Sequence, residues 1–310
     1  WVYFKLENSR SEKSRAFVSI EKPIINNASF HTISSLGEEK RYQFGAAFPF
    51  SDRPLNDRNL TIPLEFGPQE SLDVFIRLEA DNLQIPIFFL SPEGRTQRSN
   101  RRSLWYGLFF GVVFSMLAFN FFILLILKKR VYFFYLLFVS NFIFFEACLR
   151  GFGLQLVWSD FPSFQQRSLS FAIAALVATG VLFVYEFLEI RDEQPKVAGA
   201  FRILITLGVS LTIASFIVPR QIVLPIAVLL ALVAAPTMLG FGVRSWLQGY
   251  GPAKYFVFAF TIFIVGTFLF GLQKFGLLPV NAFTENIQAV GNAIQVVILS
   301  MALGDKLRQA

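Results

Sequence analysis

The stretch LWYGLFFGVVFSMLAFNFFILLIL, residues 104–127, contains no charged side chain and ends against Lys128, Lys129 and Arg130. An α-helix rises about 1.5 Å per residue, so about 20 apolar residues are enough to cross the hydrocarbon core of a bilayer. The stretch therefore predicts a membrane-spanning helix. It also marks a change in composition, because most of the acidic residues lie in residues 1–103 and long apolar runs follow.

Six further apolar runs come after the first. They occupy residues 131–149, 169–188, 201–218, 221–243, 254–275 and 286–303. The runs at 201–218 and 221–243 are nearly continuous, and only Pro219 and Arg220 separate them. Proline breaks the helical hydrogen-bond ladder and arginine prefers the membrane interface, so we expect a turn there. The sequence thus predicts a bundle of seven transmembrane helices.

The positions of lysine and arginine predict how this bundle is oriented. The chain has a net charge of +7, and in a membrane protein such an excess favours loops that face the cytoplasm and anionic lipid over a nucleic-acid site. One side of the predicted bundle receives ten: Lys128, Lys129, Arg130, Arg191, Lys196, Arg202, Arg244, Lys254, Lys306 and Arg308. The other side receives four: Arg150, Arg167, Arg220 and Lys274. Arg95, Arg98, Arg101 and Arg102 reduce the difference to ten against eight, but a folded domain committed to export overrides so small a bias. We expect the N-terminus outside and the C-terminus inside.

The residues before the first span alternate between apolar and polar side chains, which is typical of half-buried β-strands. The apolar members are Leu72, Val74, Ile76, Leu78 and Ala80 in one run, Leu60, Ile62, Leu64 and Phe66 in a second, and Ile85, Ile87 and Phe89 in a third. Pro63 and Pro86 indicate edge strands or bulges. We predict a β-sandwich at residues 1–100, a seven-helix domain at 101–304 and the start of a linker at 305–310. Because the first strand, residues 1–8, begins abruptly, we expect the sandwich to lack part of its N-terminal side.

Residue types that build catalytic and metal sites are scarce. Cys148 is the only cysteine and His31 the only histidine, so the sequence offers no intrachain disulfide and no cysteine or histidine cluster for a metal. We find no catalytic motif. The chain is therefore expected to be no enzyme in itself and to hold neither a metal nor a cofactor.

Several stretches together resemble bacterial seven-transmembrane receptors with diverse intracellular signalling modules. In the N-terminal part they are WVYFKLEN (residues 1–8), FPFSDRPLNDRNLTIPLEF (48–66) and LQIPIFFLSPE (83–93). In the membrane part they are GFGLQLVW (151–158), YEFLEIRDEQP (185–195), GLLP (276–279) and GNAIQVVILSMALGDKL (291–307). The N-terminal domain resembles the second extracellular domain type of that family. Gln295 departs from the resemblance, since many members carry an acidic residue there.

The resemblance implies a jelly-roll sensor domain in the periplasm and a bundle in the bacterial inner (plasma) membrane. It also implies that the last helix continues into a cytoplasmic effector in cis, of the histidine kinase, diguanylate cyclase or phosphatase type. The partners that it implies are the lipid bilayer and a periplasmic ligand or protein. A carbohydrate is one candidate ligand, a homodimer is one candidate assembly, and nucleic acid is not expected. Signalling through a two-component system or cyclic di-GMP would follow.

Three amides lie on one face of the last predicted helix. Gln288, Asn292 and Gln295 are spaced at i, i+4 and i+7, and Gly291 beside them would let a neighbouring helix approach closely. Polar side chains in a membrane must face the bundle or a cavity. The three therefore form either a ligand pocket or switch next to the exiting helix, or interhelical hydrogen bonds that only hold the bundle together.

A second polar group follows the second span. Glu146 and Arg150 are four residues apart on one helix face and should form an ion pair. With Gln155, Trp158 and Lys274 they could line an outward cavity. Alternatively, the pair lies at the interface and Arg150 extends its charge toward water.

In the N-terminal domain, aromatic and basic residues are candidates for ligand binding. Trp1, Tyr3, Phe44, Phe48 and Phe50 could form a platform that stacks on a sugar, although such aromatics more often belong to a core. The polar segment 51–59, with Arg53 and Arg58, is either a recognition loop or a solvated connection.

We therefore predict a transmembrane receptor that detects a periplasmic ligand or partner and passes a conformational change through the bundle. Two other classes stay open. A transporter or channel would need helices broken by glycine or proline in two related halves, and Pro225 and Pro236 supply only isolated breaks without a repeat. A membrane adaptor would bind partner proteins through the N-terminal domain.

Overall fold

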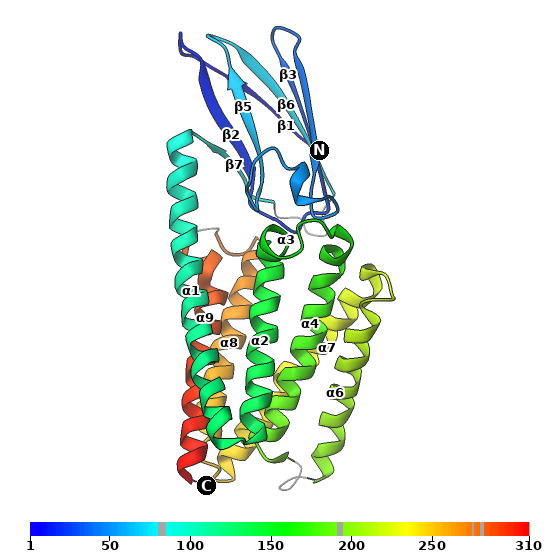
Figure 1. The fold of residues 1–310 in the computed structure, drawn as a ribbon, viewed down its shortest axis with the longest axis vertical. Coiled ribbons are helices and arrows are strands. Elements are labelled where there is room, and N and C mark those ends of the chain that lie inside the picture. Colours follow the sequence, from blue (N-terminus) through cyan, green and yellow to red (C-terminus); the bar gives the residue numbers. More distant parts are fainter. Residues whose placement is uncertain (80–84, 191–194, 275, 280–281, 310) are drawn as a thin grey trace. The chain divides into compact units, whose positions relative to one another are not determined.

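The computed structural model describes residues 1–79, 85–190, 195–274, 276–279 and 282–309. Its N-terminal part is built from two antiparallel sheets (Figure 1). The four-stranded sheet has the order β1 (Val2–Glu7), β6 (Ser71–Glu79), β3 (Asn27–Ser34), β4 (Glu39–Phe44). The three-stranded sheet has the order β5 (Leu60–Phe66), β2 (Ser14–Ile20), β7 (Ile87–Leu90). The predicted β-sandwich is confirmed.

The alternating pattern of the sequence places apolar side chains between the two sheets. Along β6, Leu72, Val74 and Ile76 are buried while their neighbours in sequence are less so. Period-two burial of this kind requires one strand face to meet a core. The proline positions also agree with expectation, because Pro63 lies in the edge strand β5 and Pro86 directly precedes the edge strand β7. Ala80, predicted to continue β6, lies outside the described residues.

Phe44 belongs to the core of the sandwich. Its ring is 1% exposed and stacks on Phe30 with 5.3 Å between the ring centroids. Phe44 ends β4 at one edge of the four-stranded sheet, while β1 lies at the opposite edge. Trp1 and Tyr3, at β1, are 80% and 57% exposed. The fold therefore separates these aromatics and gives Phe44 a structural role.

Within the described residues, seven helices are long and apolar enough to cross a membrane (Figure 1). They are α1 (Pro92–Leu127), α2 (Arg130–Leu149), α4 (Pro162–Phe187), α6 (Pro195–Ala214), α7 (Arg220–Leu247), α8 (Ala253–Lys274) and α9 (Ala282–Gln309), and the short α3 (Phe152–Leu156) lies between α2 and α4. α1, α4 and α6 all begin with proline, whose fixed φ and missing N–H suit a first helical position. Pro219 precedes α7, as expected of the residue that divides two spans.

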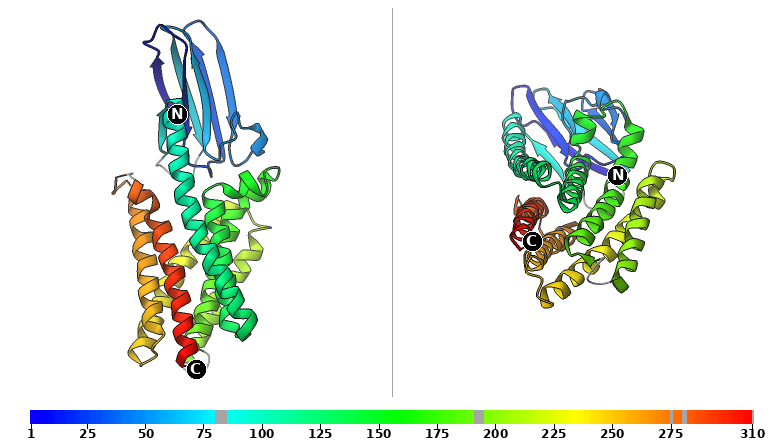
Figure 2. Two further views of the ribbon diagram at one scale, coloured as in Figure 1. Left: turned by 60° about the vertical axis from the view of Figure 1, so that its left-hand side comes forward. Right: turned by 60° about the horizontal axis from the view of Figure 1, so that its bottom comes forward.

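Side-chain contacts and close approaches at glycines join each long helix to the next, and join α1 to α9. Aromatic rings supply several of them, and small residues supply others where helices approach closely. Figure 2 shows α8 and α9 side by side along their length. The contacting pairs are Phe109–Phe142 (α1–α2), Phe138–Phe183 (α2–α4), Gly208–Ala178 (α6–α4), Phe201–Phe241 (α6–α7), Gly242–Phe256 (α7–α8), Gly266–Gly291 (α8–α9) and Asn120–Ser300 (α1–α9).

Hydrogen bonds fix α9 among its neighbours. Asn120 Nδ2 on α1 donates to Ser300 Oγ at 2.7 Å, and the hydroxyls of Tyr132 and Tyr135 on α2 donate to the carbonyls of Leu303 and Val296 at 3.2 and 2.9 Å. A polar group in an apolar bundle needs such a partner because no water is present to form a hydrogen bond with it instead. α9 is thus tied to α1 and α2 by polar contacts as well as by packing.

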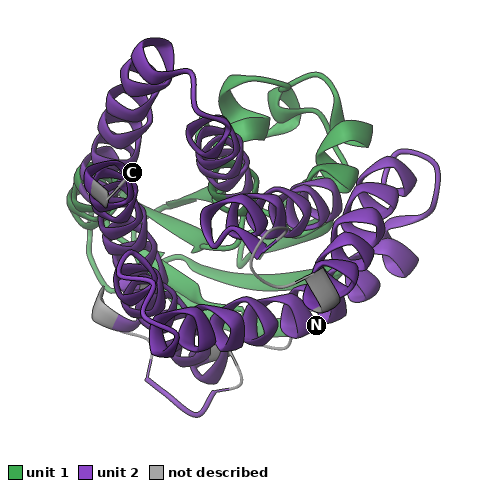
Figure 3. Cartoon of the chain, turned by 90° about the horizontal axis from the view of Figure 1, so that it is seen from below, with its two compact units in different colours: residues 1–104, 146–168 green, residues 105–145, 169–310 purple. Residues whose placement is uncertain are grey.

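The chain divides into two compact units that do not coincide with the boundary at the first span (Figure 3). The sandwich unit comprises Trp1–Leu104 together with Glu146–Ser168, and the bundle unit comprises Trp105–Phe145 together with Leu169–Ala310. The sandwich unit therefore contains the first turns of α1, the last residues of α2, all of α3 and the start of α4. Three long helices begin or end inside the unit that holds the β-sandwich.

We expect Phe44→Ala to destabilise the sandwich by about 3–5 kcal/mol, because it removes a fully buried ring and leaves a cavity. Trp1→Ala should leave stability within about 0.5 kcal/mol of the parent, since the side chain is exposed. Proteolysis of the whole chain across a urea series, read from cleavage inside residues 1–79, measures both. Equal midpoints for the two variants would contradict a core position for Phe44.

Candidate functional site: the contact between the β-sandwich and the α2–α4 connection

The connection between α2 and α4, residues 150–161, depends on two glycines. Gly151 has a φ of +76°, and a Cβ at this position would stand 2.5 Å from Cβ of Pro23. A Cβ on Gly153 would stand 1.9 Å from the ring of Trp158. Only glycine fits either place, because other residues clash and strain the backbone at Gly151. The connection therefore folds tightly and lies directly against the segment that holds Pro23.

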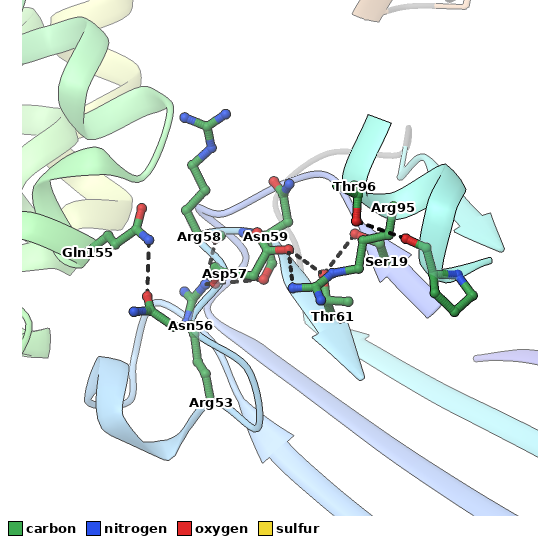
Figure 4. Close-up of polar contacts among 11 residues, drawn as sticks. Ser19, Arg53, Asn56, Asp57, Arg58, Asn59, Thr61, Arg95, Thr96 and Gln155 are labelled. Carbon is green, nitrogen blue, oxygen red and sulfur yellow. Dashed lines mark hydrogen bonds and ion pairs between the residues drawn. The ribbon is translucent and has the colours of Figure 1, made fainter. Parts of the chain in front are cut away.

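The segment between β4 and β5, which we call the Arg53 loop (residues 50–59), is organised around one guanidinium. Arg53 is 8% exposed, and its Nη1 donates to the carbonyls of Asp57 at 3.0 Å and Arg58 at 2.5 Å (Figure 4). Burial lowers the pKa of Arg53 to about 10, so the side chain stays charged at neutral pH. A charged donor that satisfies several carbonyls holds a loop of this length in one conformation.

The Arg53 loop touches the α2–α4 connection at three points. Gln155 Nε2 donates to Asn56 Oδ1 at 3.2 Å (Figure 4). The guanidinium of Arg58 lies 4.3 Å from the ring centroid of Phe152. The backbone N–H of Phe50 donates to the carbonyl of Ser159 at 3.0 Å. Together with Pro23 against Gly151, these form the docking contact. It involves backbone, cation–π and amide interactions, so it specifies one arrangement of the two segments.

The first turns of α1 are held by ion pairs. Glu21 is nearly buried, and its carboxylate accepts hydrogen bonds from Arg98 Nε at 2.7 Å and from Arg102. Arg95 lies 3.6 Å from Asp57, whose carboxylate also accepts from the N–H of Asn59 at 3.0 Å (Figure 4). Ion pairs with a buried carboxylate resist separation more than exposed pairs do, because one partner would lose its compensating charge. The sandwich thus holds α1 as well as the connection.

The structure does not bring the five predicted aromatics of the N-terminal domain together. Trp1 and Tyr3 are exposed at one sheet edge, and Phe44 lies in the core. Phe48 and Phe50 are half-buried after β4, where Phe50 packs against Arg53. Arg53 and Arg58 serve the loop and its docking contact. Phe44, Arg53 and Arg58 therefore have structural contacts in the sandwich unit, and the five aromatics do not share one face.

The second predicted group is distributed over separate contacts. Glu146 and Arg150 form the expected ion pair, with Oε2 and Nε 2.6 Å apart and Glu146 fully buried. Gln155 belongs to the docking contact, and the indole N–H of Trp158 donates to Gln165 Oε1 at 2.6 Å. Lys274 ends α8, and its side chain lies outside the described residues. The contacts of Glu146, Arg150, Gln155 and Trp158 stabilise the turn from α2 through α3 to α4.

Gln288, Asn292 and Gln295 are all buried on α9, as their spacing predicts. Gly291 lies opposite Gly266, which confirms the predicted close approach and identifies α8 as the neighbour. Gln288 Oε1 and Gln273 Oε1 of α8 accept no hydrogen bond from the described residues. Buried amide oxygens normally have a partner, so this face of α9 has capacity to bond a rearranged neighbour. That capacity suits the switch interpretation of the sequence.

One contact that sequence reasoning missed lies at the end of α4. Lys306 Nζ of α9 donates to the carbonyl of Phe187 at 2.7 Å and lies 2.9 Å from Oε1 of Glu189. The hydroxyl of Tyr250 donates to the same carbonyl at 3.1 Å. A cation at a helix C-terminus satisfies its last carbonyls and its dipole. The sequence offered one signal for this contact, because its two sides lie in stretches 185–195 and 291–307, which both resemble the family.

Comparison with known proteins agrees with this architecture. A family model described as 7TM diverse intracellular signalling matches residues 102–306, and one described as 7TMR-DISM extracellular 2 matches residues 1–91. No curated protein and no solved structure matches the chain. The resemblance predicted from the sequence is confirmed for both parts.

We expect Gly151→Ala to open the docking contact. Alanine would clash with Pro23 and would strain the left-handed backbone by about 1 kcal/mol. Gly249→Ala is the matched control, because Gly249 has a φ of +94° but a Cβ there meets nothing within 4 Å. Hydrogen exchange of residues 151–158 should rise about tenfold in Gly151→Ala alone, as local opening becomes easier. If exchange at residues 151–158 is equal in the parent and both variants, Gly151 and Pro23 do not form the docking contact.

The Gly266–Gly291 approach makes a second prediction. In Gly291→Ala the new Cβ would stand 3.5 Å from the carbonyl oxygen of Ile262, an ordinary contact, so stability should hardly change. Gly291→Leu must push α8 away and should cost about 1–3 kcal/mol. Thermal unfolding in detergent compares them with Gly304→Leu, where a Cβ meets nothing within 4 Å. A similar melting temperature for both leucine variants would argue against close packing.

Proposed function

The chain belongs to the seven-transmembrane receptors with diverse intracellular signalling modules, and from that premise we propose that it detects a ligand or partner with its β-sandwich unit and passes the change along α1, α2 and α4. The observation that carries this proposal is the docking contact. The sandwich, the α2–α4 connection and the first turns of α1 form one compact unit. A change in the sandwich therefore acts directly on the ends of three helices.

We propose that the sandwich lies in the periplasm and the C-terminus in the cytoplasm of a bacterial inner membrane. The excess of lysine and arginine on the C-terminal side supports this orientation. The family description, which pairs an extracellular domain with intracellular signalling, agrees with it.

The far end of α4 suggests how the change reaches the output. α4 begins inside the sandwich unit, and its last carbonyls hold Lys306 of α9. Because a helix is stiff along its axis, a shift or rotation of α4 acts on the end of α9 through Lys306. We describe signalling as a change in the populations of two packings, of which the ligand favours one.

We propose that α9 leads into a cytoplasmic effector in cis, such as a histidine kinase, diguanylate cyclase or phosphatase module. The family description supports an intracellular signalling module without naming one. Such effectors commonly act in pairs, so a homodimer is part of the proposal. The sandwich ligand is proposed as a periplasmic small molecule or protein.

The proposal predicts that a change at the docking contact alters α9 at a distance. Arg58→Gln removes the cation from Phe152, and in the whole chain in nanodiscs it should change hydrogen exchange at residues 303–309 about fivefold or more, the size of a coupling of about 1 kcal/mol. Lys306→Gln should raise exchange in the same segment directly, because it removes the contact with α4.

The matched control is Arg15→Gln, which removes the same charge from an exposed pair with Glu65. Exchange at 303–309 should then match the parent. If Arg58→Gln loosens residues 151–158 but leaves 303–309 unchanged, signalling through this route is ruled out. Solute flux in proteoliposomes would instead favour a transporter.

A further inference from the structure

A polar hollow lies within the sandwich unit, between the sandwich, the first turns of α1 and the α2–α4 connection. Its volume is about 170 Å³. Its charged lining residues are Glu21, Asp57, Arg58, Arg95, Arg98 and Arg102. Most of the other lining side chains are serine, asparagine or glutamine, which can donate or accept hydrogen bonds. The hollow is thus a small site that favours charged or hydrogen-bonding ligands.

Its charge balance favours an anion. Four arginines face two carboxylates, and arginine keeps its charge at any physiological pH. Of the two lining carboxylates, Glu21 lies between Arg98 and Arg102, and Asp57 pairs with Arg95. The side chains of Arg95, Arg98 and Arg102 are 30%, 24% and 19% exposed. Partial burial strengthens attraction to an anion relative to an open surface.

We propose that this hollow binds a small oxyanion, a carboxylate or phosphate group. Guanidinium groups offer paired N–H donors that match the two oxygens of such a group. The volume is smaller than the roughly 300–1,000 Å³ typical of drug-sized ligands, so a single anionic group fits better than a large molecule. Serine and amide side chains around the arginines complete its hydrogen bonds.

Two sources supply this chemistry. One is a free metabolite anion, and the other is the phosphate of an anionic lipid, because Arg102 lies just before the apolar run that begins at residue 104. The site is the same in both cases. The experiment below distinguishes them.

The position of the hollow gives the anion a role, which rests on the proposed function. Arg58 approaches it from the docking contact, whereas Arg95, Arg98 and Arg102 approach it from α1. An anion between them lowers the mutual repulsion of the arginines and draws the Arg53 loop and α1 together. It would therefore favour one arrangement of the sandwich unit over another.

The test uses the whole chain in phosphatidylcholine nanodiscs, titrated with inorganic phosphate or succinate at constant ionic strength. We expect saturable binding by calorimetry. Arg95→Gln should weaken it about tenfold, because one charged donor is lost. Glu21→Gln should tighten it, because Arg98 and Arg102 lose a competing carboxylate. Arg41→Gln, an exposed arginine outside the hollow, is the charge-matched control and should bind like the parent.

Nanodiscs that contain phosphatidylglycerol separate the two sources. If the anionic lipid weakens phosphate binding in the parent but not in Arg95→Gln, the lipid phosphate occupies the hollow. If it has no effect while phosphate or succinate binds, the ligand is a free anion. Either result supports the site.

The site is refuted if neither anion nor anionic lipid binds saturably, or if Arg41→Gln weakens binding as much as Arg95→Gln. Should Arg95→Gln fold poorly, the tightening expected in Glu21→Gln decides alone. Calorimetry measures anion binding directly, and it does not depend on hydrogen exchange at residues 303–309, which tests the coupling. A failed anion site would therefore leave the coupling proposal standing, and a failed coupling would leave the anion site standing.

Discussion

The guanidinium of Arg53 is the interaction on which the sandwich unit depends most. By donating to the carbonyls of Asp57 and Arg58 it holds the loop from which three consecutive side chains reach outward. Asn56 meets Gln155 on the connection, Asp57 meets Arg95 on α1, and Arg58 meets the ring of Phe152. A buried charge is costly unless it has hydrogen-bond partners, and the loop carbonyls supply them to Nη1 of Arg53, so the loop conformation and the charge stabilise each other.

Tight approach at glycines complements this charged centre. Gly151 leaves room for Pro23, and Gly153 leaves room for the Trp158 ring. The connection can therefore pack closely against the sandwich with only the short helix α3. The stretch GFGLQLVW is thus a surface shaped to receive the sandwich. Its partner surface is the stretch at residues 48–66, which explains physically why both stretches occur in one chain.

Polar bonds in the bundle concentrate on α9. Asn120, Tyr132 and Tyr135 hold its length, and its end holds the last turn of α4 through Lys306. In an apolar environment these few bonds choose among packings that dispersion alone would leave close in energy. A helix held this way has few alternative positions, as a helix that carries a signal requires.

The sequence by itself determined the number of spans, the β-sandwich, the Glu146–Arg150 pair and the family, and it left Pro63 and Pro86 to edge strands or bulges. These follow from local rules, since apolar length, period-two alternation and i,i+4 spacing depend only on neighbouring residues. Only the tertiary structure decided that Phe44 is core, that residues 146–168 pack with the sandwich, that Arg53 organises a loop and that Lys306 caps α4. Each of these depends on which distant segments meet, and no local pattern of residues encodes the partner of a long-range contact.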